Sequence, residues 1–136
     1  MKIAISATGQ GLEASVDPRF GRAPFLIIVE TDAEQVVDVI DNSTAQEVAH
    51  GAGISAATVL ALAGVEAVLT GHLGPKAFAV LEAAGIQFIP VSGGTVGEVV
   101  QRFRRGEFAV SRRATSAPHQ GMRGGFGRGS KGRGMA

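Results

Sequence analysis

Asp17-Pro-Arg-Phe-Gly-Arg-Ala-Pro24, followed directly by Phe25-Leu-Ile-Ile-Val29, is the stretch that decides how this chain folds. Two prolines and a glycine within eight residues exclude a helix and predict a shaped loop. The apolar, β-branched run behind the loop predicts a buried strand. Because the loop holds Arg19 and Arg22 beside that strand, we interpret it as part of an anion site. A rigid turn with two solvated arginines remains the alternative.

On either side of this stretch, the spacing of apolar residues, together with the glycines and prolines between the apolar segments, predicts eight helices and strands. Residues 8–24 form a long loop between the first two strands. The predicted strands are Lys2–Ala7, Phe25–Glu30, Val36–Ile40, Val65–Thr70 and Ile86–Val91, and the predicted helices run from Gly51 to about Ala63, from Pro75 to Ala84 and from Val96 to Arg105.

The order of these elements predicts an α/β fold. Strand–helix alternation in the second half requires parallel strands with right-handed crossovers, whereas the first three strands form an antiparallel meander. The simplest arrangement is a ribonuclease H-like, five-stranded mixed sheet in the order 3-2-1-4-5 with three helices on its faces.

This topology gathers a candidate site at one edge of the sheet. Four of the five strands end at that edge, together with the loop 8–24 and the amino ends of the three helices, where free amides favour an anion. Glycines that merely permit tight turns are the alternative interpretation. The predicted binding residues are Arg19, Phe20, Gly21, Arg22, Gly51, Gly53, Gly71, His72, Gly74, Ser92 and Gly93.

Two histidines at this edge are candidate metal ligands or anion donors. His72 lies between Gly71 and Gly74, which leave its side chain uncrowded, and His50 precedes the first helix. Solvated loop histidines are the alternative for both.

Composition restricts the function further. The 136 residues suffice for one domain, and the absence of cysteine excludes disulfides, cysteine-ligated metals and a thiol nucleophile. No run is long enough to span a membrane, and the N-terminus lacks signal-peptide features, so we expect a cytoplasmic protein.

Catalytic signatures are missing from the sequence. The first strand lacks the carboxylate with which a ribonuclease H-like nuclease begins its metal site. There is no phosphate-loop or dinucleotide-binding motif, and neither Ser6 nor Ser92 has a recognisable base partner. We expect a binding protein rather than an enzyme.

Several segments of the sequence resemble those of a known family. The matching segments are Ser15-Val-Asp-Pro-Arg-Phe-Gly-Arg-Ala-Pro-Phe25, Asn42, Gly51-Ala-Gly-Ile-Ser-Ala-Ala57, Gly64-Val, Thr70-Gly-His-Leu-Gly-Pro-Lys-Ala-Phe78 and Leu81-Glu-Ala-Ala-Gly-Ile86. They are similar, over residues 1 to about 108, to the dinitrogenase iron–molybdenum cofactor biosynthesis family of the NifX and NifB C-terminal-domain type, and most similar to its short stand-alone members.

The resemblance implies the same ribonuclease H-like fold and a carrier of an anionic metal–sulfur cluster, of iron–molybdenum, iron–sulfur or molybdenum–copper type. It also implies a protein donor or recipient in cofactor assembly. Two departures weaken direct metal ligation: Arg19 stands where relatives often have histidine, and Leu73 where they often have cysteine.

The last part of the chain differs from the rest. Residues 1–111 carry 7 basic and 12 acidic residues, whereas 112–136 carry six basic residues and no acid. We therefore predict a domain over 1–110 and a disordered Gly/Arg-rich tail over 111–136. Its Arg-Gly-Gly stretch with Phe126 leaves open weak RNA binding, so an RNA- or protein-interaction module is the alternative function.

Overall fold

The regular elements occur where the sequence predicts them. The computed structural model describes residues 1–42 and 52–114. Its strands are β1 (Lys2–Ala7), β2 (Phe25–Glu30), β3 (Gln35–Asp41), β4 (Ala67–Thr70) and β5 (Gln87–Pro90); its helices are α2 (Ala52–Ala63), α3 (Pro75–Ala83) and α4 (Val96–Arg104), with a short 3₁₀ turn, η1 (Phe20–Arg22).

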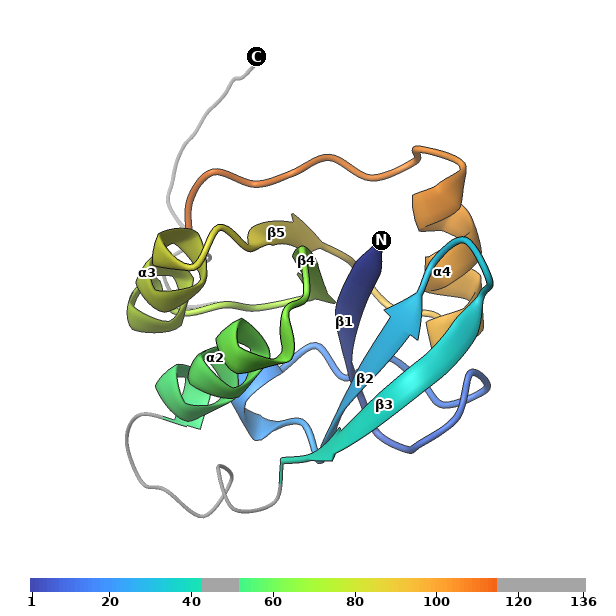
Figure 1. Ribbon diagram of the computed structural model, residues 1–136, viewed down its shortest axis with the longest axis horizontal. Helices are drawn as coiled ribbons and strands as arrows, with labels where there is room; N and C mark the ends of the chain where they lie inside the picture. Colours follow the sequence, from blue (N-terminus) through green and yellow to red (C-terminus); the bar gives the residue numbers. More distant parts are fainter. Residues whose placement is uncertain (43–51, 115–136) are drawn as a thin grey trace.

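The five strands form one mixed sheet in the order β3-β2-β1-β4-β5, as predicted. The pairs β1–β2 and β2–β3 are antiparallel, whereas β4 runs parallel to both β1 and β5. Figure 1 shows this sheet with the three helices around it. The carboxyl ends of four strands therefore lie at one edge of the sheet, as predicted from the order of the elements.

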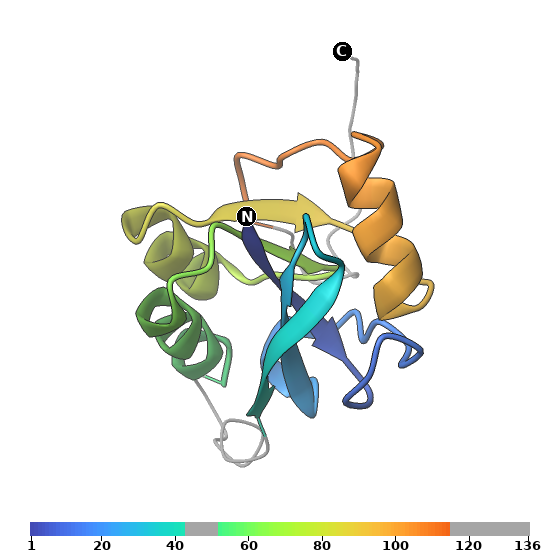
Figure 2. The same ribbon diagram turned by 45° about the vertical axis from the view of Figure 1, so that its right-hand side comes forward.

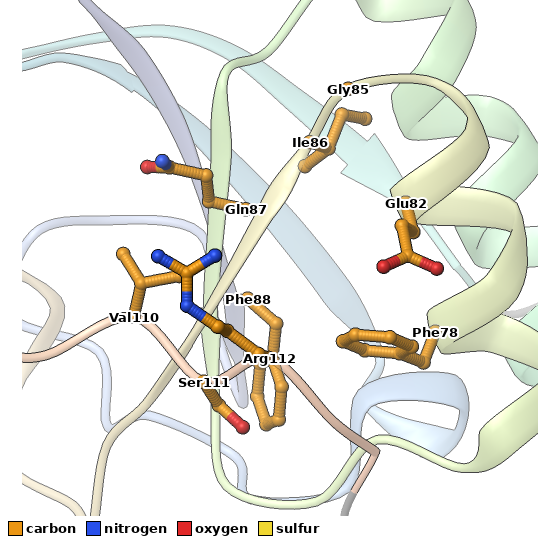
Figure 3. Close-up of a pocket in the computed structure, with 9 residues that line it drawn as sticks. All are labelled: Phe78, Glu82, Gly85, Ile86, Gln87, Phe88, Val110, Ser111 and Arg112. Atoms are coloured by element: carbon orange, nitrogen blue, oxygen red, sulfur yellow. The ribbon is translucent and has the colours of Figure 1, made fainter.

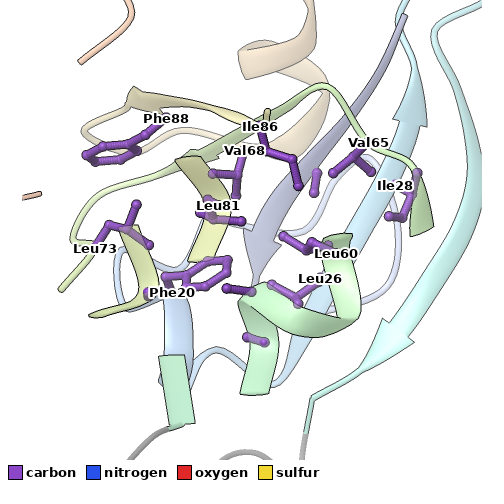
Figure 4. Close-up of a cluster of buried hydrophobic side chains, with 14 residues drawn as sticks. Phe20, Leu26, Ile28, Leu60, Val65, Val68, Leu73, Leu81, Ile86 and Phe88 are labelled. Atoms are coloured by element: carbon purple, nitrogen blue, oxygen red, sulfur yellow. The ribbon is translucent and has the colours of Figure 1, made fainter. Parts of the chain in front are cut away.

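The helices cover opposite faces of the sheet, with α2 and α3 on one face and α4 on the other (Figure 2). An apolar cluster of side chains lies on each face. On the α2 and α3 face, Leu60 and Leu81 pack with Phe20, Val68 and Phe88 (Figure 4). On the other face, α4 buries its valines against the opposite sides of the same strands. The alternation of side chains along each strand makes this division possible, since successive residues point to opposite faces.

Some boundaries differ from the prediction. β4 begins at Ala67 rather than Val65, because the chain first turns through Gly64 (φ 75°) and Val65 packs into the α2–α3 cluster. Gly85 and Gly106 also adopt positive φ just past α3 and α4, where helix ends are predicted.

Several predictions fall outside the described residues. These concern His50, Gly51 and the tail from residue 115 onward. Ser111, the first residue of the predicted tail, pairs with Phe88 of β5, its amide donating to the Phe88 carbonyl over 2.8 Å. No helix within the described parts of the chain is long and apolar enough to cross a membrane.

Candidate functional site at the carboxyl edge

The loop before β2 is attached to the turn after β4. The His72 amide donates to the Pro18 carbonyl at 2.7 Å, and Arg19 forms a parallel backbone bridge with His72. A Cβ at Gly71 would lie 2.7 Å from the Pro18 Cβ. Only glycine therefore permits this close approach, which brings together two parts of the predicted site.

A network of buried polar groups holds the loop before β2 against the turn after β4. Ser6, at the end of β1, has its hydroxyl oxygen 2.6 Å from both the Asp17 carbonyl and Thr70 Oγ1. Ser6 and Thr70 are fully buried. Since buried hydroxyls need partners, this network fixes the loop relative to the ends of β1 and β4.

Arg19 is committed to an ion pair within its own loop. Its Nε and Nη2 donate to the two oxygens of Asp17 at 3.0 and 2.9 Å, and its amide donates to Asp17 Oδ1 at 2.9 Å. The Asp17 side chain is only 2% exposed. Burial pushes the pKa of Asp17 upward, but the hydrogen bonds and charge of Arg19 together hold it below its usual value. Because Nε and Nη2 both donate to Asp17, Arg19 has fewer N–H groups left for an anion than a solvated arginine.

The remaining predicted residues of this loop have mainly structural surroundings. Phe20 is buried in the α2–α3 cluster, so it is not positioned to contact a ligand. Asn42, which is 4% exposed, donates to the Ala23 carbonyl at 2.8 Å and to the Gly21 carbonyl at 3.4 Å, holding the η1 turn in place. Arg22 is exposed beside it.

The helix starts differ in what they offer an anion. The Val96 and Gly97 amides of α4 already donate to Ala14 and Leu12, and Glu98 closes a capping box with Thr95. At α3, Gly74 is the N-cap, and the Lys76 and Ala77 amides have no acceptor in the described parts of the chain. The sequence predicts amides available to an anion at all three helix starts. The start of α4 does not fit this prediction, because carbonyl groups of the loop 11–16 accept hydrogen bonds from its amides. Gly53 lies in the first turn of α2.

One pocket lies where the carboxyl ends of β4 and β5 meet. Its volume is about 560 Å³. Three predicted binding residues contribute to it, and none of the described residues that line it carries a carboxylate. The lining residues are Pro18, Gly71, His72, Pro90, Val91, Ser92, Arg102 and Phe108. We call it the carboxyl-edge pocket.

Sequence reasoning missed Arg102 and Phe108. Arg102 lies near the end of α4, and its Cζ is 4.8 Å from the centre of the Phe108 ring. Its Nε donates to Glu107 Oε1 at 3.1 Å. Glu107 and Phe108, two and three residues after the end of the last predicted helix, were the available signal. Only the folded structure shows that Phe108 lines the pocket and that Glu107 contacts Arg102.

A second pocket, on the α3 side of β5, contains none of the predicted site residues. It has a volume of about 310 Å³ and is lined by Phe78, Glu82, Gly85, Ile86, Gln87, Phe88, Val110, Ser111 and Arg112 (Figure 3). The Glu82 carboxylate makes it less suited to an anion than the carboxyl-edge pocket.

The carboxyl-edge pocket offers donors rather than a set of metal ligands. Neither the His72 ring nor the Ser92 hydroxyl has a hydrogen-bond partner among the described residues. Within residues 1–42 and 52–114, no group of three or more His, Cys, Asp or Glu side chains could hold a metal ion. Among the described residues of this pocket, His72 is the one candidate metal ligand, and hydrogen-bond donors and a cation accompany it.

Comparison with known proteins agrees with the resemblance found in the sequence. The model of the family described as dinitrogenase iron–molybdenum cofactor matches residues 1–106. An uncharacterised protein of Methanocaldococcus jannaschii is 31% identical over 109 residues, which cover 79% of this chain and 88% of that protein.

Two solved structures share both sequence and fold. The apo form of the orange protein from Desulfovibrio gigas is 43% identical with a TM-score of 0.80, covering 85% of this chain and 96% of that one. A putative NifB protein from Thermotoga is 33% identical with a TM-score of 0.73, covering 85% and 97%.

Proposed function

The chain belongs to the dinitrogenase iron–molybdenum cofactor family, and from this premise we propose that it is a non-catalytic cytoplasmic carrier or scaffold. Its cargo is an anionic metal–sulfur cluster of iron–molybdenum, iron–sulfur or molybdenum–copper type, held for cofactor assembly or delivery to a recipient protein. The family's association with the iron–molybdenum cofactor supports the class of cargo.

The carboxyl-edge pocket is the observation that carries this proposal. It combines His72, Ser92 and Arg102 with apolar walls, and no described lining residue carries a carboxylate. An anion bound there would exchange water for charge-assisted hydrogen bonds, which are stronger than neutral ones. The Lys76 and Ala77 amides at the start of α3, which have no acceptor among the described residues, add to the positive potential a few residues after His72.

The donor set also indicates how such a cluster would be held. The chain has no cysteine, so thiolate ligation is excluded. Hydrogen bonds to cluster sulfurs and one imidazole ligand fit the residues present. A cargo held mainly by hydrogen bonds can be transferred without breaking several metal–protein bonds, which suits a carrier.

Anaerobic purification from the native host, with elemental analysis and an absorption spectrum, tests this proposal. We expect molybdenum or iron, together with sulfide, at a fixed ratio to protein. The His72→Ala variant should lose part of this metal, whereas His119→Ala, a matched change in the Gly/Arg-rich tail, should retain it. Metal-free protein, or equal losses in both variants, would contradict the proposal.

A further inference from the structure

We infer that Arg102 is the main cation for the anion in the carboxyl-edge pocket and that Glu107 and Phe108 position it. This inference rests on the proposed function and deepens it, because it identifies the side chain that binds the proposed cargo and the groups that orient that side chain. The anion is a tetrahedral or cluster thioanion that offers two acceptor atoms to the terminal nitrogens of one guanidinium.

The guanidinium of Arg102 is held on two sides. Glu107 accepts from Nε at 3.1 Å, and the Phe108 ring packs against the group with its centre 4.8 Å from Cζ. Neither terminal nitrogen of Arg102 has an acceptor in the described parts of the chain. The side chain is therefore oriented by the protein while the end that can bind two acceptors stays available.

The neighbouring arginines lack this combination. Arg19 uses Nε and Nη2 on Asp17. Arg104 donates from Nη1 to Glu34 and lines a different pocket. Arg105 shares Glu107 but does not line the carboxyl-edge pocket. Of the arginines that the structure describes, Arg102 alone lines this pocket.

The segment that places Glu107 and Phe108 is attached at both ends. The Glu107 amide donates to the Arg102 carbonyl at 3.1 Å, and the Ser111 amide donates to Phe88 at 2.8 Å. The segment 107–111 thus runs from the end of α4 to the edge of β5. It is part of the pocket's construction, because it supplies both groups that orient Arg102.

The lining of the pocket favours sulfur-bearing anions over strongly hydrated ones. Two terminal N–H groups on one carbon match two acceptors on one centre, which a monatomic anion cannot provide. The walls formed by Pro18, Pro90, Val91 and Phe108 displace water from the bound anion. Desolvation costs most for compact, strongly hydrated ions, so large thioanions lose least.

Calorimetric titration of the full chain with tetrathiomolybdate tests these roles. We expect Arg102→Gln to weaken binding at least tenfold. Arg102→Lys should weaken it at least fivefold, since it keeps the charge but not the paired nitrogens. Arg104→Gln is the matched control, because it removes the same charge from an ion-paired arginine on the same helix. It should change affinity less than twofold.

Two further comparisons test positioning and selectivity. Glu107→Ala should weaken binding about threefold by releasing Nε, whereas Glu107→Gln keeps an acceptor, removes a negative charge and should bind at least as tightly as the unmodified protein. The unmodified protein should prefer tetrathiomolybdate over molybdate at least tenfold, and chloride should not compete.

The NMR resonance of the Arg102 Nε–Hε group can be followed in the unmodified protein, so this measurement does not depend on whether a variant folds. Its chemical shift should change with tetrathiomolybdate concentration along a saturation curve that gives the same affinity as the calorimetry. Equal losses in Arg102→Gln and Arg104→Gln, or an unshifted resonance, would overturn the inference and leave the carrier proposal standing. Absence of tetrathiomolybdate binding would also overturn the inference. The carrier proposal is tested separately, by metal analysis of the protein purified from its native host.

Discussion

The His72 amide and the Pro18 carbonyl form a 2.7 Å hydrogen bond that joins the loop before β2 to the turn after β4. This contact places an imidazole next to a proline-rigid loop. It also requires the absence of a side chain at Gly71, since a Cβ there would overlap Pro18. The position of His72 in the pocket therefore depends on a backbone contact between segments that are far apart in the sequence.

Gly71→Ala should separate these two segments. The added Cβ would lie 2.7 Å from the Pro18 Cβ and 3.1 Å from its carbonyl oxygen. We expect a loss of about 1–3 kcal/mol in the free energy of unfolding, as for other overpacked sites. Urea denaturation measures this loss, and weaker tetrathiomolybdate binding should accompany it.

Gly74→Ser is the control for that variant. A Cβ at Gly74 meets nothing within 4 Å, and serine is a favoured N-cap residue. Its free energy of unfolding should stay within about 0.5 kcal/mol of the unmodified value. If Gly71→Ala were as stable as Gly74→Ser, the contact with Pro18 would not determine the position of the turn.

Asp17 should make stability depend on pH in the acid range. Burial raises its folded-state pKa, but the hydrogen bonds and charge of Arg19 outweigh this effect and hold the pKa below the unfolded value of about 3.9. A lowered folded pKa contributes stability that is complete above the unfolded pKa and disappears as pH falls through the folded pKa. We expect Asp17→Asn to cost roughly 1–3 kcal/mol at pH 7 and much less at pH 2.

Urea denaturation of both proteins at pH 7 and pH 2 checks this expectation. The amide side chain of the Asp17→Asn variant would keep an acceptor for the Arg19 backbone N–H, so the change isolates the charge of the carboxylate rather than the turn. A difference between the two proteins that is independent of pH would show that the Asp17–Arg19 ion pair contributes nothing to folding.

The two helix starts near the pocket should respond differently to an anion. The Val96 and Gly97 amides donate to Ala14 and Leu12, so their hydrogen exchange should be slow and unaffected by tetrathiomolybdate. The Lys76 and Ala77 amides of α3 should exchange faster and become protected on binding. Protection confined to α4 would show that the anion displaces the loop 11–16 instead.

Truncation after Ala114 separates the carrier from the alternative interaction module. All the described residues that line the carboxyl-edge pocket come before that point, so we expect tetrathiomolybdate affinity to change less than twofold. RNA binding, if the tail provides it, should disappear with six positive charges reduced to two. Loss of anion binding on truncation would place part of the site in the tail.

The fold could be predicted from sequence because its signals are local. Gly64, Gly85 and Gly106 end helices at positive φ, and the apolar runs of β2 and β4 could only be buried strands. The sheet order then followed from the rules for parallel and antiparallel connections.

The candidate site could be predicted only as residue types near strand ends, because the partners of each side chain depend on the folded geometry. Residue types and strand ends sufficed to select Gly71, His72 and Ser92, which do line one pocket. The Asp17–Arg19 pair arises from the geometry of one turn. Arg102 reaches the pocket because the segment 107–111 is attached to β5, a contact that no periodicity in the sequence indicates.

The central claim is that a metal–sulfur anion binds at the carboxyl-edge pocket. Titration of ¹⁵N-labelled protein with tetrathiomolybdate, followed by amide resonances, tests it most directly. We expect saturable shifts centred on Gly71, His72 and Ser92, and unchanged affinity in Arg112→Ala/Arg113→Ala. Shifts without saturation, or a loss of affinity in that double variant equal to that of Arg102→Gln, would contradict it.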